Sequence, residues 1–258
     1  MTIIYLSPHL DDAALSCGGL IWEQSQSSVL VEIWTICAGD PPMDLLSPLA
    51  KELHQRWQLG SDAVAFRREE DKQSCRILGV KYHHFCIPDA IYRLHPETKE
   101  YLYDTEEAIF NDFSDSEYPL LSNLAAQIAE HLPPDSILIS PLSLGNHIDH
   151  QLTRQAAMMQ KALLVYYADY PYINVQKISE NNLQAQGYQP ITFPVSQDGL
   201  NAWQDSIAVY RSQISSFWEN VDQMKVAIDK YHEKSGGVTL WCMPDVSLEL
   251  NRRIGQLL

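Results

Sequence analysis

The sequence predicts an α/β fold, a Rossmann-like three-layer sandwich with a mostly parallel sheet and helices on both faces. Short runs rich in β-branched and aromatic residues alternate with longer stretches that suit helices. Such alternation is typical of parallel sheets, because each crossover between parallel strands is a helix lying on one face or the other. The 258 residues contain no internal repeat and no low-complexity linker, so we expect a single domain over residues 1–258.

The expected elements follow in order along the chain. Apolar, β-branched runs predict strands at 2–6, 29–36, 81–87, 136–140 and 163–168. The intervening and following stretches predict helices at about 12–26, 50–78, 119–132, 147–162, 198–216 and 219–234. Two segments, 38–48 and 88–118, fit neither pattern and are expected to be long loops, which in compact domains more often form functional rims than plain connections.

The predicted first helix is rich in small residues. They are Ala13, Ala14, Ser16, Gly18 and Gly19. A glycine inside a helix costs about 1 kcal/mol relative to alanine, so close packing must offset that cost. We therefore expect this helix to lie close against the sheet.

Composition excludes several classes of partner. The formal net charge of −15 would repel a nucleic-acid backbone or an anionic membrane surface. The five cysteines are scattered without a C-x-x-C pair, which indicates reduced thiols in a cytoplasmic protein. The apolar run at the start is too short for a signal peptide, and no uncharged run approaches membrane-spanning length. We expect a cytoplasmic protein that binds a small molecule; the sequence carries no signal for its oligomeric state.

Titratable side chains gather after two of the predicted strands. These are His9, Asp11 and Asp12 in "SPHLDD" after the strand at 2–6, and His147, Asp149 and His150 in "GNHIDH" after the strand at 136–140. In the common strand order 3-2-1-4-5 these two strands are neighbours, and the crevice between their carboxyl ends is where ligands bind. We therefore expect the two clusters to face each other.

The residue types in the clusters are typical of a catalytic metal site. Two imidazoles and one carboxylate around an open position match catalytic zinc, which keeps its fourth position for water. The remaining groups suit proton transfer: Asp11 as general base and His147 as acid or oxyanion donor, with Asp149 orienting the His147 ring. Asn146 is expected to cap the helix that follows.

At these residues the sequence resembles the PIG-L/LmbE-like family of zinc-dependent de-N-acetylases. The family motif P-H-x-D-D is present as "PHLDD" and the motif H-x-D-H as "HIDH". A family helix pattern of Arg, Glu and Leu-Gly matches Arg67, Glu70 and Leu78-Gly79. The stretches "YADYPY" and "YRSQ" are weaker matches, so the resemblance runs over most of the chain. It departs at Leu10 and Ala13, where many members have Pro and Glu.

The resemblance implies roles for individual residues. It implies that His9, Asp12 and His150 bind Zn²⁺, that Asp11 is the general base, and that His147 is the acid or oxyanion stabiliser. The implied activity is that of a metal-dependent amidohydrolase. It removes the N-acetyl group from an N-acetylglucosamine-type sugar or glycoconjugate and releases acetate and a free amine.

Further polar residues near the strand ends and in the long loops could bind sugar hydroxyls. They are Asp40, Arg67, Arg68, Asp89 and Arg93. For each of them a turn cap or a surface ion pair is an equally good interpretation of the sequence.

Two other functions remain open at this stage. Two histidines and one carboxylate also form the facial triad of non-haem iron oxygenases, although those enzymes need no extra base and acid and are usually all-β barrels. The second alternative is a non-catalytic sugar-binding protein on the same fold. Such a protein would be expected to lose the base or a metal ligand first, and this sequence retains both.

Overall fold

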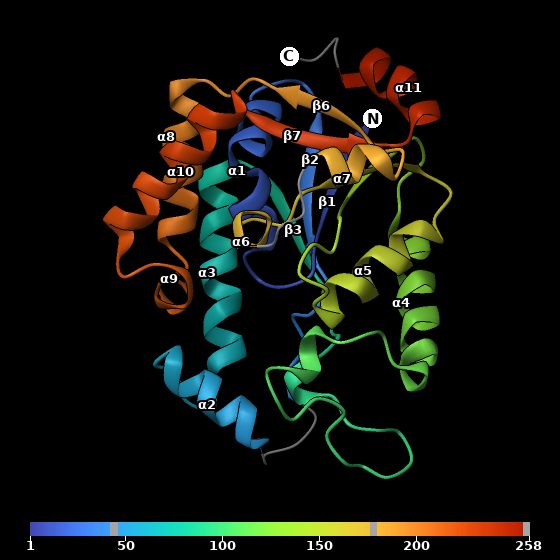
Figure 1. The fold of residues 1–258 in the computed structure, drawn as a ribbon, viewed down its shortest axis with the longest axis vertical. Helices are drawn as coiled ribbons and strands as arrows, with labels where there is room; N and C mark the ends of the chain where they lie inside the picture. The colour runs from blue at the N-terminus through green and yellow to red at the C-terminus, as the bar shows by residue number, and fades with distance from the viewer. Residues whose placement is uncertain (42–45, 176–179, 255–258) are drawn as a thin grey trace.

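The sheet of the computed structural model confirms the predicted fold class and strand order. The structure describes residues 1–41, 46–175 and 180–254. Within these ranges seven strands form one sheet in the order β3-β2-β1-β4-β5-β7-β6 (Figure 1). The strands are β1 (Thr2–Ser7), β2 (Leu30–Thr35), β3 (Lys81–His84), β4 (Ile137–Pro141), β5 (Leu163–Tyr167), β6 (Gln189–Phe193) and β7 (Val238–Cys242). The five strands expected from the sequence are all present, and their pairs are parallel.

Sequence reasoning missed the two strands at one edge of the sheet. β7 pairs antiparallel with both β5 and β6. β6 contains Pro190 and is mostly exposed or half-buried, so it lacks the continuous apolar run that marks an inner strand. β7 is the five-residue run "VTLWC", which directly follows the helix α10 (Val221–Ser235) and pairs antiparallel, so it lies outside the alternation that identified the parallel strands.

Helices cover both faces of the sheet. They are α1 (Asp12–Ser25), α2 (Pro48–Arg56), α3 (Ala63–Leu78), α4 (Tyr118–His131), α5 (Ile148–Met158), α6 (Tyr172–Val175), α7 (Glu180–Ala185), α8 (Gln197–Ala208), α9 (Arg211–Phe217), α10 (Val221–Ser235) and α11 (Pro244–Ile254). The helices α1, α3, α8 and α10 share one apolar core with the sheet, whereas α4 and α5 share another (Figure 1). None of these helices, within the described ranges, is both long and apolar enough to cross a membrane.

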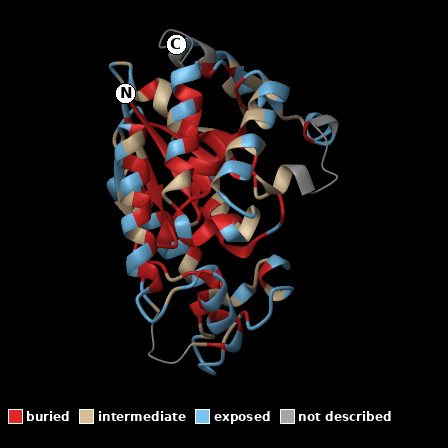
Figure 2. Ribbon diagram, turned by 90° about the vertical axis from the view of Figure 1, so that its left-hand side faces the viewer, coloured by how far each residue is buried: buried red, intermediate tan, exposed pale blue. Residues whose placement is uncertain are grey.

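The central strand β1 contributes to both cores through its alternation. Ile3 and Tyr5 point into the core under α1, and Ile4 and Leu6 point into the core under α4 and α5. All four side chains are fully buried. Because successive side chains of a strand point to opposite faces, β1 joins the two layers, and Figure 2 shows the buried sheet between them.

Two of the predicted helices are interrupted. The stretch expected as one helix over 50–78 forms α2 and α3, because Gln58 adopts a positive φ of 56° and the chain turns through Gly60 before α3 begins. The stretch expected over 198–216 forms α8 and α9. No glycine or proline causes this second break; the hydroxyl of the buried Tyr210 donates to Asp71 Oδ1 at 2.7 Å and draws the chain toward α3.

The two expected loops lie near the carboxyl ends of the parallel strands. The first ends where α2 begins at Pro48, and its residues 42–45 lie outside the described residues. The second, 88–118, holds three short 3₁₀ helices, η1 (Ala90–Tyr92), η2 (Ala108–Phe110) and η3 (Asp115–Glu117). Side chains of this loop share a third apolar cluster with α2 and the start of α3, so the loop has its own small core.

The glycines of α1 meet another helix rather than the sheet, which corrects the expectation from the sequence. A Cβ atom at Gly18 would overlap with Cδ1 of Trp203 on α8, and one at Gly19 would lie 2.8 Å from Val195 Cγ1. Trp203 is fully buried, and its Nε1 donates to Ala14 O at 2.8 Å. The small residues therefore let α1, the helix that begins with Asp12, pack closely against α8.

We expect Gly18→Ala to lower the free energy of unfolding by about 1–3 kcal/mol, the usual cost of overpacking a close-packed core. The matched control is Gly60→Ala, because the nearest atom to its new Cβ would be Asp62 Oδ1 at 3.7 Å. Urea denaturation followed by circular dichroism measures both variants. Equal stability of the two variants would contradict the close approach of α1 and α8.

Candidate metal centre and active site

The turn between β1 and α1 is held by short hydrogen bonds that fix its side chains. Ser7 Oγ donates to His9 O at 2.6 Å and accepts from Ala13 N at 3.0 Å. Asp12 Oδ2 accepts from the backbone N–H of His9 at 2.7 Å. These bonds fix the backbone of His9 and the carboxylate of Asp12 within the turn.

The second cluster is placed by the turn between β4 and α5. Ser143, Gly145 and Asn146 all adopt positive φ angles, which turn the chain sharply into the helix. His147 is the N-cap residue of α5, and its Nδ1 accepts from the backbone N–H of Asp149 at 3.1 Å. The expected cap by Asn146 is wrong, because the Asn146 amide instead donates to Phe110 O and Asn111 O in the long loop.

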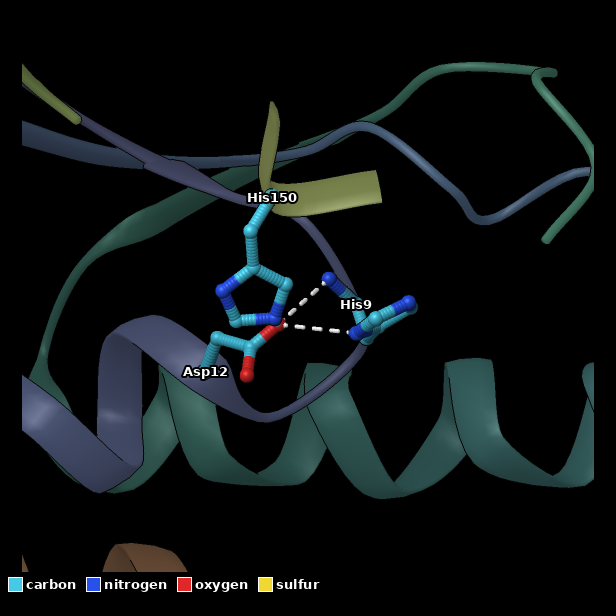
Figure 3. Close-up of side chains that lie close together, drawn as sticks. All are labelled: His9, Asp12 and His150. Carbon is cyan, nitrogen blue, oxygen red and sulfur yellow. Dashed lines mark hydrogen bonds and ion pairs between the residues drawn. The ribbon is translucent and has the colours of Figure 1, made fainter. Parts of the chain in front are cut away.

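The two clusters meet in a compact set of three ligand atoms. His9, Asp12 and His150 each offer one atom, and these atoms lie within 4.8 Å of one another. Asp12 Oδ2 is 3.1 Å from His9 Nδ1 and 3.4 Å from His150 Nε2 (Figure 3). The facing of the clusters predicted from the strand order is confirmed.

Buried carboxylates hold the far side of both histidine rings. Asp169 Oδ1 lies 2.5 Å from His150 Nδ1, and Asp169 Oδ2 accepts from Leu144 N at 2.9 Å. Asp149 Oδ2 lies 3.0 Å from His9 Nε2. Carboxylates in this position fix the tautomer of a ligating imidazole and raise its basicity. Sequence reasoning missed Asp169, although it follows the strand β5 by two residues in the stretch "YADYPY".

The residues present fit a divalent metal ion. The Nε2 atom of His150 is buried and has no hydrogen-bond partner among the described residues, and it faces the carboxylate of Asp12. Two neutral imidazole nitrogens and one carboxylate oxygen are the donors that zinc prefers at catalytic sites. Burial opposes the charge of Asp12, but the nearby His150 and His9 outweigh it and hold the pKa of this carboxyl below its ordinary value.

Asp11 lies beside this set and has a strongly shifted acidity. It is buried, and desolvation together with the charge of Asp12 raises the pKa of Asp11 to about 7, although Arg67 partly opposes the shift. Arg67 NH2 lies 3.9 Å from Asp11 Oδ1, and the guanidinium stacks 4.7 Å above the ring of Trp57. A carboxyl with this pKa can accept and return a proton near neutral pH.

His147 is held as a neutral ring. Burial and the proximity of His9 lower its pKa well below the ordinary value. Because Nδ1 accepts a hydrogen bond from Asp149 N, the single proton of the neutral ring is on Nε2. The backbone N–H of Asp149 contacts the His147 ring, whereas the Asp149 carboxylate contacts His9.

A pocket of about 170 Å³ opens onto these groups. Its floor includes His9, Asp11, Asp12 and His147, and aromatic side chains form much of its wall. The aromatic residues are Trp57 from the segment between α2 and α3, Phe110 from η2, Tyr172 from α6 and Phe217 from α9. A concave site that combines aromatic side chains with a few convergent polar groups is the usual form of a small-molecule pocket.

The five candidate substrate contacts have different surroundings. Arg67 and Asp89 line the pocket. Arg68 donates to Asp40 Oδ1 at 2.8 Å, and neither residue lines the pocket. Arg68 lies one position further along α3 than Arg67, so its side chain leaves the helix in a different direction. Arg93 is buried between Asp149 and Glu117 and does not line the pocket either.

The comparisons with known proteins agree with this geometry. The sequence profile of the family described as PIG-L, GlcNAc-PI de-N-acetylase, matches residues 4–160. The chain is 28% identical over 187 residues to 2'-N-acetylparomamine deacetylase of Niallia circulans, covering 66% of each chain. It is 27% identical over 176 residues to the Streptomyces fradiae enzyme of that name, covering 66% of this chain and 57% of the relative. The matches thus span about two thirds or less of these relatives.

A solved structure supports the same relationship. The zinc-inhibited form of teicoplanin deacetylase Orf2 superposes with a TM-score of 0.77 at 27% identity. The superposition covers 93% of this chain and 97% of that one. The similarity in structure therefore extends well beyond residue 160.

We expect the purified protein to bind about one zinc ion per chain through the three-ligand set. His150→Ala removes one of the ligand atoms and should lose most of this zinc. His147→Ala should keep it, because the Nδ1 atom of His147 is used at the N-cap of α5 and its ring lines the pocket. Elemental analysis of the two variants, prepared in parallel, is the measurement. Zinc retained by His150→Ala and lost from His147→Ala would reverse the two roles.

Proposed function

The chain belongs to the PIG-L family of GlcNAc-PI de-N-acetylases, and from this premise we propose that it is a zinc-dependent hydrolase of an N-acetylated sugar or glycoconjugate. It would release acetate and a free amine. The observation that carries the proposal is the set His9, Asp12 and His150, of which His9 and Asp12 line a pocket that Asp11 and His147 also line. The relatives that act on 2'-N-acetylparomamine and teicoplanin support the same reaction class.

The chain's own residues supply the acid–base chemistry. When bound, zinc would act as a Lewis acid on the acetyl carbonyl and make the attacking water more acidic. Asp11 takes a proton from that water, for which a pKa of about 7 is suited. As the C–N bond breaks, the same carboxyl delivers this proton to the leaving nitrogen, which departs as a neutral amine.

His147 is assigned to the developing negative charge. Its neutral ring carries the proton on Nε2, so it donates a hydrogen bond to the oxygen of the tetrahedral intermediate. A neutral imidazole is a poor proton source, because losing its proton would leave an anionic ring. Of the two roles that the sequence left open for His147, we therefore propose that of oxyanion donor.

The pocket wall suits a sugar ring. The flat faces of Phe110, Tyr172 and Phe217 can lie against its C–H groups, and Arg67 and Asp89 can bind its hydroxyls. The alternative of an iron oxygenase does not fit the mostly parallel sheet or the family match. All five cysteines are free, which supports a reducing, cytoplasmic location.

Acetate release from a panel of acetylated sugars tests the proposed reaction. The panel contains N-acetylglucosamine, N,N'-diacetylchitobiose and 2'-N-acetylparomamine, each incubated with zinc-loaded and with chelator-treated protein. We expect equal amounts of acetate and primary amine from at least one member, and none after chelation. A zinc-loaded protein that binds these sugars but releases no acetate would establish the non-catalytic alternative.

We expect Asp11→Asn to lower kcat by about 10²–10⁴-fold, the usual worth of a positioned proton-transfer group, while zinc content stays unchanged. Asp205→Asn is the control, because Asp205 forms an exposed ion pair with Lys225 and does not line the pocket. Steady-state kinetics and elemental analysis are done on the same samples. Turnover near that of the wild type in Asp11→Asn would remove the base role from this residue.

A further inference from the structure

Arg93 is a buried charge that the proposed reaction does not use. Its guanidinium lies between two carboxylates: it donates to Asp149 Oδ1 through NH1 and to Glu117 Oε2 through NH2 at 3.1 Å. Only 4% of its side chain is exposed. Tyr103 Oη also donates to Glu117 Oε2, at 2.5 Å. An arginine held from both sides in this way has a fixed position, and its planar fork suits binding two carboxylates at once.

The carboxylate of Asp149 joins Arg93 to the metal site. Its Oδ1 accepts from Arg93, and its Oδ2 accepts from Ala90 N at 3.0 Å and contacts His9 Nε2 at 3.0 Å. The opposite nitrogen of the same ring, His9 Nδ1, faces Asp12 Oδ2 at 3.1 Å. Asp149 therefore fixes the orientation of the His9 ring through Nε2, the nitrogen on the side away from Asp12. The orientation of Asp149 in turn depends on Arg93.

A second set of possible ligands overlaps the first. Among the described residues, His9, His147 and Asp149 also offer ligand atoms within 4.8 Å of one another. Both sets need His9, so each would compete with the other for it. The positive charge of Arg93 on Asp149 disfavours a cation at the second set, because like charges repel strongly at a buried position. Asp12 in the first set contacts His9 and His150, and no arginine or lysine among the described residues pairs with its carboxylate.

We propose that Arg93 is a positioning residue that acts through Asp149: it orients His9 for the set with Asp12 and His150 and keeps the metal out of the set with His147 and Asp149. The proposal rests on the proposed function only in its assignment of the metal ligands. In this proposal Arg93 determines which of the two ligand sets holds the metal. This role replaces the substrate contact expected from the sequence. It also explains why Glu117 is buried beside Arg93, since Glu117 and Tyr103 hold the guanidinium in place.

Zinc affinity in the absence of substrate tests this role. Arg93→Met removes the charge and keeps most of the side-chain volume. We expect its zinc affinity to fall by about 10- to 100-fold, the usual effect of losing an outer partner of a ligating histidine. Competition with a chromophoric chelator measures the affinity, below the melting temperature of each variant. Arg154→Met is the matched control, because Arg154 is half-buried on α5 but bonds Leu142 O and Tyr188 rather than the site.

A double-mutant cycle separates positioning from general destabilisation. If Arg93 acts through Asp149, Arg93→Met should have no further effect on zinc affinity in an Asp149→Asn background. The absorption spectrum of the cobalt-loaded protein gives a second readout, because its d–d bands depend on the ligand set. We expect the spectrum of Arg93→Met to change and that of Arg154→Met to match the wild type.

Each outcome decides the proposal. Folded Arg93→Met with the zinc affinity and cobalt spectrum of the wild type overturns it, as do equal losses in Arg93→Met and Arg154→Met or additive effects in the cycle. If Arg93→Met does not fold, Arg93→Gln replaces it, because its amide keeps a hydrogen-bond donor but removes the charge; wild-type zinc affinity in that variant overturns the proposal. Failure of acetate release leaves all these readouts intact, so the proposed reaction and the role of Arg93 are tested separately.

Discussion

The site depends on the parallel pairing of β1 with β4. Ile3, Ile4 and Tyr5 pair with residues 137–139, so the two strands run together to the same edge of the sheet. From that edge the chain leaves in opposite directions, from β1 toward β2 and from β4 toward β5. A crevice between neighbouring strands at such a switch point is the usual ligand site of open α/β sheets. It brings together His9 and His150, although 140 residues separate them in the sequence.

The burial of so many ionisable groups at this edge requires that they neutralise one another. Asp12 lies between two histidines, Asp169 holds His150, and Asp149 is shared by His9 and Arg93. Buried charges are costly unless they are paired and hydrogen-bonded. The alternation of acidic and basic side chains meets that requirement and leaves the Nε2 atom of His150 without a hydrogen bond. If the cluster served stability alone, this nitrogen would be expected to form a hydrogen bond. A metal ligand instead needs its nitrogen to be unpaired.

Sequence reasoning succeeded where local pattern and topology agree. The five parallel strands, their order and the meeting of the two clusters follow from apolar runs and from the rule for switch points. It failed where a distant contact decides the outcome. The break before α9 depends on Tyr210 reaching Asp71, and the place of Arg93 depends on Glu117 and Asp149, none of which is visible in the local pattern. Asp169 was within reach, because a carboxylate just after a strand carries the same signal that identified Asp11 and Asp12.

One part of the long loop 88–118 contacts the metal site, and another part lines the pocket. Its first part is tied to the metal site, because Ala90 N and Arg93 both bind the carboxylate of Asp149. Its later part forms the pocket wall at Phe110, whose backbone carbonyl accepts from Asn146 and whose ring lies 5.3 Å from the ring of His147. Because Asn146 bonds the backbone, a substitution at residue 110 changes the pocket wall and the packing on His147 without removing that bond. A substitution at residue 93 instead removes a partner of Asp149, whose carboxylate contacts His9. One loop therefore supports both clusters through different residues.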